Sequence, residues 1–216
     1  MIPKAVLFDL DDTLHDRRSS VEVFTPTLYQ FLEPWLVGVS LEDFRTGLHR
    51  LDYGGYVPRE VFMQRLLEAF GATNFDAVEL AKFWRSEFAN FAQPMHGAYE
   101  LLEFLRLRGI KTGIVSNGTV QLQQAKIVAL ELKVDVIVIS EAVGVKKPSA
   151  EPFLEALRLL EVQASETWFV GDHPVNDVEG AMAVGIKAFW LEREQKAEAM
   201  QATRILSLLE LRGFLE

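Results

Sequence analysis

Four consecutive apolar residues lead directly into a cluster of acids in the stretch Ala5-Val6-Leu7-Phe8-Asp9-Leu10-Asp11-Asp12-Thr13. An apolar run without alternation, stopped by polar residues, is typical of a strand buried on both faces of a parallel sheet. Parallel sheets bind their ligands beyond the carboxyl ends of their strands. This stretch therefore predicts both a fold and the place of a functional site.

Similar apolar segments recur later in the chain and are separated by segments with helical spacing. This alternation of helix and strand predicts a parallel sheet with helices on both faces. The expected strands are 5–8, 112–115, 134–139, 167–170, 186–190 and a weaker 203–206, and the expected helices are 99–108, 120–132, 151–160 and 178–184.

Residues 15–93 break this alternation. Their Phe, Leu and Trp residues recur at helical spacing, with turn signals between them, and this pattern predicts roughly three to five helices. We therefore expect an α/β core domain formed by residues 1–14 and 94–216, with an all-helical domain of residues 15–93 inserted into it.

Composition excludes several classes of protein. The 216 residues contain 22 Lys and Arg against 31 Asp and Glu, and the net charge of −9 argues against binding to a nucleic acid polymer. Cysteine is absent, which excludes disulfides, thiolate metal sites and cysteine nucleophiles. The sequence shows no secretory signal and no apolar run of the roughly 18–20 residues that cross a bilayer. We expect a cytoplasmic protein without a membrane partner.

Acids follow two of the predicted strands. Asp9 and Asp11 alternate along an extended segment, so both side chains can face one space, and Asp172 and Asp177 follow strand 167–170. Like charges held close together are costly unless a cation joins them, and Mg²⁺ prefers such oxygen ligands. The alternatives are that these acids cap helices or remain solvated.

Other polar groups follow the remaining strands. Ser116-Asn117-Gly118-Thr119 offers a hydroxyl and backbone N–H groups to an anion, although Thr119 equally suits a helix N-cap. Lys146 and Lys147 precede a proline, which favours an extended backbone, and spacing alone does not choose between them. His173 is an acid/base candidate, but Pro174 beside it favours a turn.

Taken in order, these motifs closely resemble those of the haloacid dehalogenase (HAD) superfamily, and its phosphatase branch in particular. The family motif D-x-D-x-[TV] matches residues 9–13, and the second-motif Ser or Thr matches Ser116. The lysine followed by proline matches Lys147, and GDxxxxD matches residues 171–177. The resemblance spans the chain and implies a Rossmann-like sheet of order 5-4-1-2-3 with a helical cap inserted after the first motif. Asp12 departs from the glycine of many relatives.

The resemblance also implies roles for these residues. Asp9 is the expected nucleophile, forming an aspartyl-phosphate, and Asp11 the expected general acid and base. Mg²⁺ is expected to bind Asp9, the backbone carbonyl of Asp11 and Asp172, with Asp177 acting through water. The expected phosphate-binding residues are Ser116, Lys147 and, through its backbone N–H, Asn117.

The implied function is a Mg²⁺-dependent phosphatase acting on a small phosphorylated metabolite. Dehalogenases resemble this pattern but lack an acid at the place of Asp11, because a departing halide needs no proton. The stretch 116–126 looks like that of capped relatives acting on nucleoside monophosphates or sugar phosphates. A phosphomutase, a dehalogenase and a non-enzymatic phospho-receiver are the alternatives. Candidate substrate contacts, each of which can instead be an ordinary turn or surface residue, are His15, Arg18, Tyr53, Gly54, Gly55, Tyr56 and Arg59.

Overall fold

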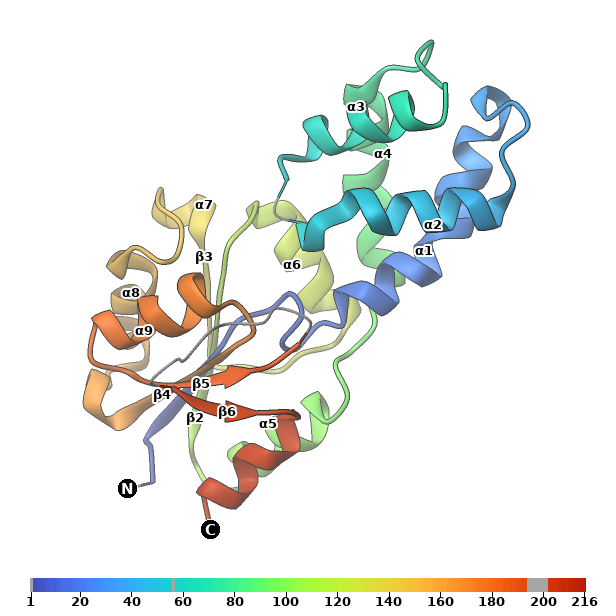
Figure 1. Ribbon diagram of the computed structural model, residues 1–216. Helices are drawn as coiled ribbons and strands as arrows, with labels where there is room; N and C mark the ends of the chain where they lie inside the picture. Colours follow the sequence, from blue (N-terminus) through green and yellow to red (C-terminus); the bar gives the residue numbers. More distant parts are fainter. Residues whose placement is uncertain (1, 56, 194–201) are drawn as a thin grey trace. The chain divides into compact units, whose positions relative to one another are not determined.

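The structure, a computed structural model, describes residues 2–55, 57–193 and 202–216 (Figure 1). The chain divides into two compact units, one formed by Met1–Asp16 and Pro94–Glu216 and the other by Arg17–Gln93. The first unit contains all the motifs that the sequence places at strand ends. The second is helical, and its action as a cap stays a prediction.

A six-stranded sheet forms the centre of the first unit, and all its pairings are parallel. The strand order is β3-β2-β1-β4-β5-β6, so β1 lies in the middle and is fully buried. This order contains the predicted 5-4-1-2-3 arrangement, with β6 added beside β5, and it confirms the Rossmann-like fold. The strands are β1 Ala5–Phe8, β2 Lys111–Ser116, β3 Val136–Ile139, β4 Thr167–Gly171, β5 Lys187–Leu191 and β6 Thr203–Ile205.

Helices cover both faces of this sheet. Helices α8 and α9 lie on one face, while α5 and the C-terminal 3-10 helix lie on the other (Figure 1). On the first face, Phe153 of α8 contacts Phe169 of β4, with ring centroids 5.2 Å apart. The helical elements are α5 Ala98–Leu107, α6 Val120–Ala129, α7 Ser140–Val143, α8 Ala150–Leu160, α9 Gly180–Ala183, and the 3-10 helices η4 Ala164–Glu166 and η6 Leu208–Phe214.

One helix differs from the sequence expectation. The periodicity predicts a helix over 178–184, whereas the chain is already helical from Pro174: a π-helix, η5 Pro174–Glu179, leads into the short α9. A proline is tolerated in the first turn of a helix, because the backbone N–H that it lacks would have no hydrogen-bond partner within the helix. The wider turn of a π-helix departs from the 3.6-residue period, so the apolar spacing did not reveal it.

The second unit has a core of aromatic side chains. Phe24 contacts Trp84 and Phe88, with ring centroids 5.0 and 5.6 Å apart. The helices of the second unit are α1 Arg17–Leu32, α2 Leu41–Asp52, α3 Arg59–Ala69 and α4 Ala77–Glu87, with 3-10 helices η1 Glu33–Trp35, η2 Tyr53–Gly55 and η3 Phe88–Phe91.

No helix in the described part of the chain has the length and apolarity to cross a membrane.

Candidate active site

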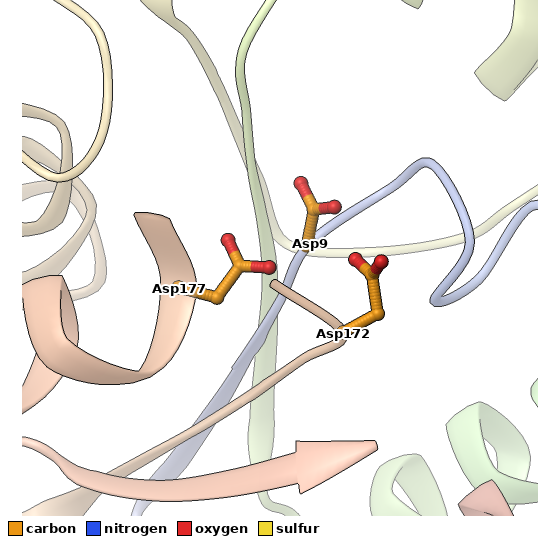
Figure 2. Close-up of side chains that lie close together, drawn as sticks. All are labelled: Asp9, Asp172 and Asp177. Atoms are coloured by element: carbon orange, nitrogen blue, oxygen red, sulfur yellow. The ribbon is translucent and has the colours of Figure 1, made fainter. Parts of the chain in front are cut away.

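Three aspartates meet at the carboxyl end of the sheet. Asp9 follows β1, Asp172 follows β4, and Asp177 lies in the π-helix η5 (Figure 2). Each offers a carboxylate oxygen, and these oxygens all lie within 4.8 Å of one another. The three residues are 8%, 4% and 0% exposed, respectively. Because β1 and β4 pair directly in parallel, their ends necessarily lie side by side.

The backbone of Gly171 lies very close to the carboxyl group of Asp177. A Cβ on Gly171, the last residue of β4, would lie 2.5 Å from the carboxyl group of Asp177, so only glycine fits there. The backbone N–H of His173 donates to Asp177 Oδ2 at 2.9 Å. Trp190 of β5 donates its indole N–H to the carbonyl oxygen of Asp172 at 2.8 Å. These two hydrogen bonds hold the Asp177 side chain and the Asp172 backbone in place.

Lys147 supplies positive charge to the cluster. Its ammonium donates to Asp9 Oδ1 at 2.7 Å and to Asp177 Oδ1 at 2.6 Å. Its side chain is 2% exposed, and burial acts to lower its pKa, but the two carboxylates raise the pKa above its usual value. The neighbouring Lys146 is exposed. The structure therefore distinguishes the two lysines that spacing left equivalent.

Burial and mutual repulsion disfavour full ionisation of these acids. Burial raises the pKa of Asp9 to about 7, against the lowering effect of Lys147, and the charge of Asp177 raises it further. Burial and the charges of Asp177 and Asp9 raise the pKa of Asp172 to about 9. One lysine thus does not neutralise the cluster.

The donor set fits a divalent cation. Asp172 Oδ1 is buried and has no hydrogen-bond partner among the described residues, although buried polar atoms are nearly always paired. Carboxylate oxygens are the ligands that hard divalent cations prefer. Asp9, Asp172 and Asp177 are thus the residues that would hold such an ion.

The end of β2 presents Ser116 and Asn117. Ser116 is 2% exposed, its Oγ accepts a hydrogen bond from Gln123 Nε2 at 2.6 Å, and its hydroxyl donates to the Asn117 carbonyl oxygen at 3.4 Å. The Asn117 side chain donates to the Lys147 carbonyl oxygen at 3.0 Å and accepts from the Lys147 N–H at 2.8 Å. These reciprocal bonds tie the lysine segment to the end of β2. The motif implied only a backbone N–H role for Asn117, and this side-chain role was not predicted.

Asp11 lies in the turn after β1 and has several hydrogen-bonding neighbours. His15 Nδ1 lies 2.6 Å from Asp11 Oδ1, and Lys126 Nζ lies 2.7 Å from each carboxylate oxygen. Burial alone would raise the pKa of Asp11, but the charge of Lys126 and the contacts with His15 hold it well below its usual value. His15 is fully buried, and its ring contacts Asp11. Its predicted role as a substrate contact stays a prediction.

Lys126 and Gln123 lie in the stretch 116–126, and the sequence motifs assign no individual role to either residue. They lie three residues apart on α6, and both are buried, whereas Gln121 and Gln124 on the same helix are exposed. A sequence signal did exist, because polar residues three apart can share one face of a helix with buried neighbours. That signal is weak without knowledge of what the face contacts.

His173 has a structural contact at the edge of the site. Its Nδ1 accepts from the backbone N–H groups of Val175 and Asn176 at 3.2 and 3.1 Å, which caps the π-helix. Burial lowers the pKa of His173. Both observations favour the neutral imidazole as a hydrogen-bond acceptor.

Six of the seven candidate substrate contacts belong to the second unit. In that unit, a Cβ on Gly55 would lie 2.7 Å from Arg17 Nε, and Arg17 forms a buried, two-pronged ion pair with Asp52. The Arg59 guanidinium lies over the Trp84 ring, 4.6 Å from its centroid. Arg18 is exposed and Gly54 has a φ of 63°. Tyr53 lies in η2, and Tyr56 lies outside the described residues.

Comparison with known proteins agrees with this geometry. Residues 3–185 match the haloacid dehalogenase-like hydrolases. The chain belongs to this family of hydrolases.

Particular relatives match along most of the chain. The glyceraldehyde 3-phosphate phosphatase of Pyrococcus abyssi is 30% identical over 194 residues, covering 88% of this chain and 81% of that protein. The phosphoserine phosphatase of Thermus thermophilus is 30% identical over 243 residues, covering 97% and 96%. A HAD phosphatase structure from Thermococcus onnurineus is 29% identical, with a TM-score of 0.69 over 100% of this chain and 98% of that one. A 2-haloacid dehalogenase structure from Pseudomonas syringae is 28% identical, with a TM-score of 0.64 over 100% and 98%.

Proposed function

We propose that this hydrolase is a Mg²⁺-dependent phosphatase that cleaves small phosphomonoesters through an aspartyl-phosphate on Asp9. The observation that carries the proposal is the buried contact between Asp9 and Lys147, beside the carboxylates of Asp172 and Asp177. A nucleophilic carboxylate needs nearby positive charge to meet a phosphate dianion, and the lysine supplies part of that charge. Bound Mg²⁺, held by Asp9, the Asp11 carbonyl and Asp172, with Asp177 acting through water, would neutralise charge on the phosphoryl oxygens.

The proposed reaction has two steps. An Asp9 carboxylate oxygen attacks phosphorus while the bond from phosphorus to the ester oxygen breaks, and Asp11 gives a proton to that leaving oxygen. Asp11 has to enter this step protonated, and because Lys126 and His15 hold its pKa low, the protonated group is a strong acid. Water then attacks the phosphorus of the aspartyl-phosphate, Asp11 takes the proton from this water, and the bond between phosphorus and Asp9 breaks. The products are an alcohol and inorganic phosphate. Ser116, Lys147 and the backbone N–H of Asn117 bind the phosphoryl oxygens throughout.

The acid at position 11 favours phosphate esters over haloacids. An alkoxide leaving group needs a proton, whereas a halide does not, so Asp11 has a use only in the first reaction. The proposed substrates are small phosphorylated metabolites of the nucleoside monophosphate or sugar phosphate class. The names of the Pyrococcus and Thermus relatives, which refer to glyceraldehyde 3-phosphate and phosphoserine, support small substrates.

The test is phosphate release by the purified protein. We expect 4-nitrophenyl phosphate and several members of a panel of sugar phosphates, phosphoserine and nucleoside monophosphates to yield inorganic phosphate. Activity should disappear in EDTA and return with excess Mg²⁺. Chloride release from 2-chloropropionate, or conversion of a sugar phosphate to its isomer without free phosphate, would instead identify a dehalogenase or a phosphomutase.

The raised pKa values of Asp9 and Asp172 predict that Mg²⁺ stabilises the protein more at high pH. Both folded-state pKa values, about 7 and about 9, lie above the value of 3.8 for an unperturbed aspartate. The folded protein therefore holds these protons more tightly than the unfolded chain does, so metal-free stability falls as pH rises from about 4 to about 9. Mg²⁺ binds the ionised acids and offsets this loss.

Thermal unfolding at pH 6 and pH 9, with and without Mg²⁺, measures this effect. We expect the rise in Tm with Mg²⁺ to be larger at pH 9, and the difference between the two pH values to shrink in Asp172→Asn. An equal rise at both pH values in the wild type would contradict the assignment of these acids as metal ligands.

A further inference from the structure

Helix α6 holds the carboxyl group of Asp11 from one side. Lys126 Nζ donates to both Asp11 oxygens at 2.7 Å, and Gln123 Nε2 donates to Asp11 Oδ2 at 3.0 Å. Lys126 is 3% exposed and Gln123 is 2% exposed, whereas the Asp11 side chain is 28% exposed, so the contacts are partly buried. Partly buried, charge-assisted contacts restrict the carboxyl group more strongly than surface contacts do.

The same helix also contacts the end of β2. Gln123 Nε2 donates to Ser116 Oγ at 2.6 Å as well as to Asp11. Helix α6 begins at Val120, immediately after Thr119, whose side chain caps the helix. One helix therefore contacts both Asp11, in the turn after β1, and Ser116, the last residue of β2.

We propose that Lys126 is a positioning residue, which orients the Asp11 carboxyl group for proton transfer to the leaving oxygen. This inference rests on the proposed phosphatase function, in which Asp11 is the proton donor. The terminal torsion of an aspartate side chain is broad, so an unrestrained carboxyl group would rotate. Proton transfer requires the donor to lie within hydrogen-bond reach of the leaving oxygen. A lysine that contacts both carboxylate oxygens removes this rotation.

The test uses the leaving group to separate positioning from a general structural effect. For Lys126→Met, kcat/KM for an alkyl phosphate such as glycerol 2-phosphate should fall by about 10- to 100-fold. For 4-nitrophenyl phosphate, kcat/KM should change by less than about 3-fold, because 4-nitrophenolate leaves without a proton. The ratio of the two values is the readout, since kcat/KM covers the steps up to cleavage of the ester bond.

Two further variants make the result specific. Lys126→Arg keeps the charge and the donors and should largely restore the wild-type ratio. Lys133→Met, at an exposed lysine that follows the same helix, is the matched control and should leave both values unchanged. If Lys126 acts through Asp11, adding Lys126→Met to Asp11→Asn should produce little further change in the ratio.

An equal fall of kcat/KM for both substrates, or an unchanged ratio in Lys126→Met, would overturn the positioning role. If Lys126→Met does not fold, Lys126→Gln applies the same test, because its shorter, uncharged side chain cannot reproduce the contacts of Lys126 with both Asp11 oxygens. Failure of the wild type to hydrolyse either ester would instead reject the phosphatase proposal itself, so the two failures are distinguishable.

Discussion

The Asp9→Asn variant is expected to lose phosphomonoester turnover by about 10⁴-fold or more, because it lacks the atom that attacks phosphorus. The amide can still accept a hydrogen bond from Lys147, so the loss should not come from unfolding. Its uncharged oxygen is a poor nucleophile and cannot form the aspartyl-phosphate. The thermal stability of the variant should remain near that of the wild type or rise, since one of several crowded, buried carboxylates has been neutralised.

Rapid acid quenching and mass spectrometry measure this prediction directly. The wild type mixed with substrate should carry a phosphoryl group on the peptide that contains residue 9, and Asp9→Asn should not. Asp12→Asn is the matched control, because it removes an acid from the same turn. Asp12 has a φ of 57°, a conformation that Asn adopts readily. A phosphorylated intermediate or undiminished turnover in Asp9→Asn would contradict the assignment of the nucleophile.

The sheet and the end-of-strand acids could be predicted because they depend on local pattern and simple topology. An apolar run such as residues 5–8 is recognisable as a buried strand, and parallel strands place their carboxyl ends at one edge. Asp9 and Asp172 therefore had to lie near each other once β1 and β4 were neighbours. The resemblance to the HAD family predicted that β1 and β4 are neighbours, because strand order does not follow from the spacing of residues in the sequence.

The contacts around Asp11 could not be predicted in the same way. Asp11 and Lys126 are 115 residues apart in sequence, and their contact depends on how α6 packs beside the turn after β1. The same applies to the reciprocal bonds of Asn117 with the Lys147 backbone. Residue type indicates that a lysine can pair with an acid, but only packing determines which acid it meets.

The resemblance to the HAD family had already matched Lys147 rather than Lys146, and the packing shows which two acids Lys147 contacts. Lys147→Met should lower kcat/KM for phosphomonoesters by about 10³-fold, as expected for loss of a buried group that stabilises charge in the transition state. It should also lower the stability of the metal-free protein by about 3–5 kcal/mol, because Asp9 and Asp177 lose a cation that both contact in the buried site. Mg²⁺ should restore part of that stability.

The pH dependence of this variant has a definite sign. Lys147 lowers the pKa of Asp9, so its removal should raise that pKa above about 7 and leave less of the nucleophile ionised at neutral pH. The residual activity of Lys147→Met should therefore increase from pH 7 to pH 9 more steeply than wild-type activity does. Lys146→Met is the matched control, since it removes the adjacent, exposed lysine and should leave kcat/KM, stability and the pH profile unchanged. Equal losses in the two variants would show that the buried contact between Lys147 and Asp9 does not carry the catalytic charge.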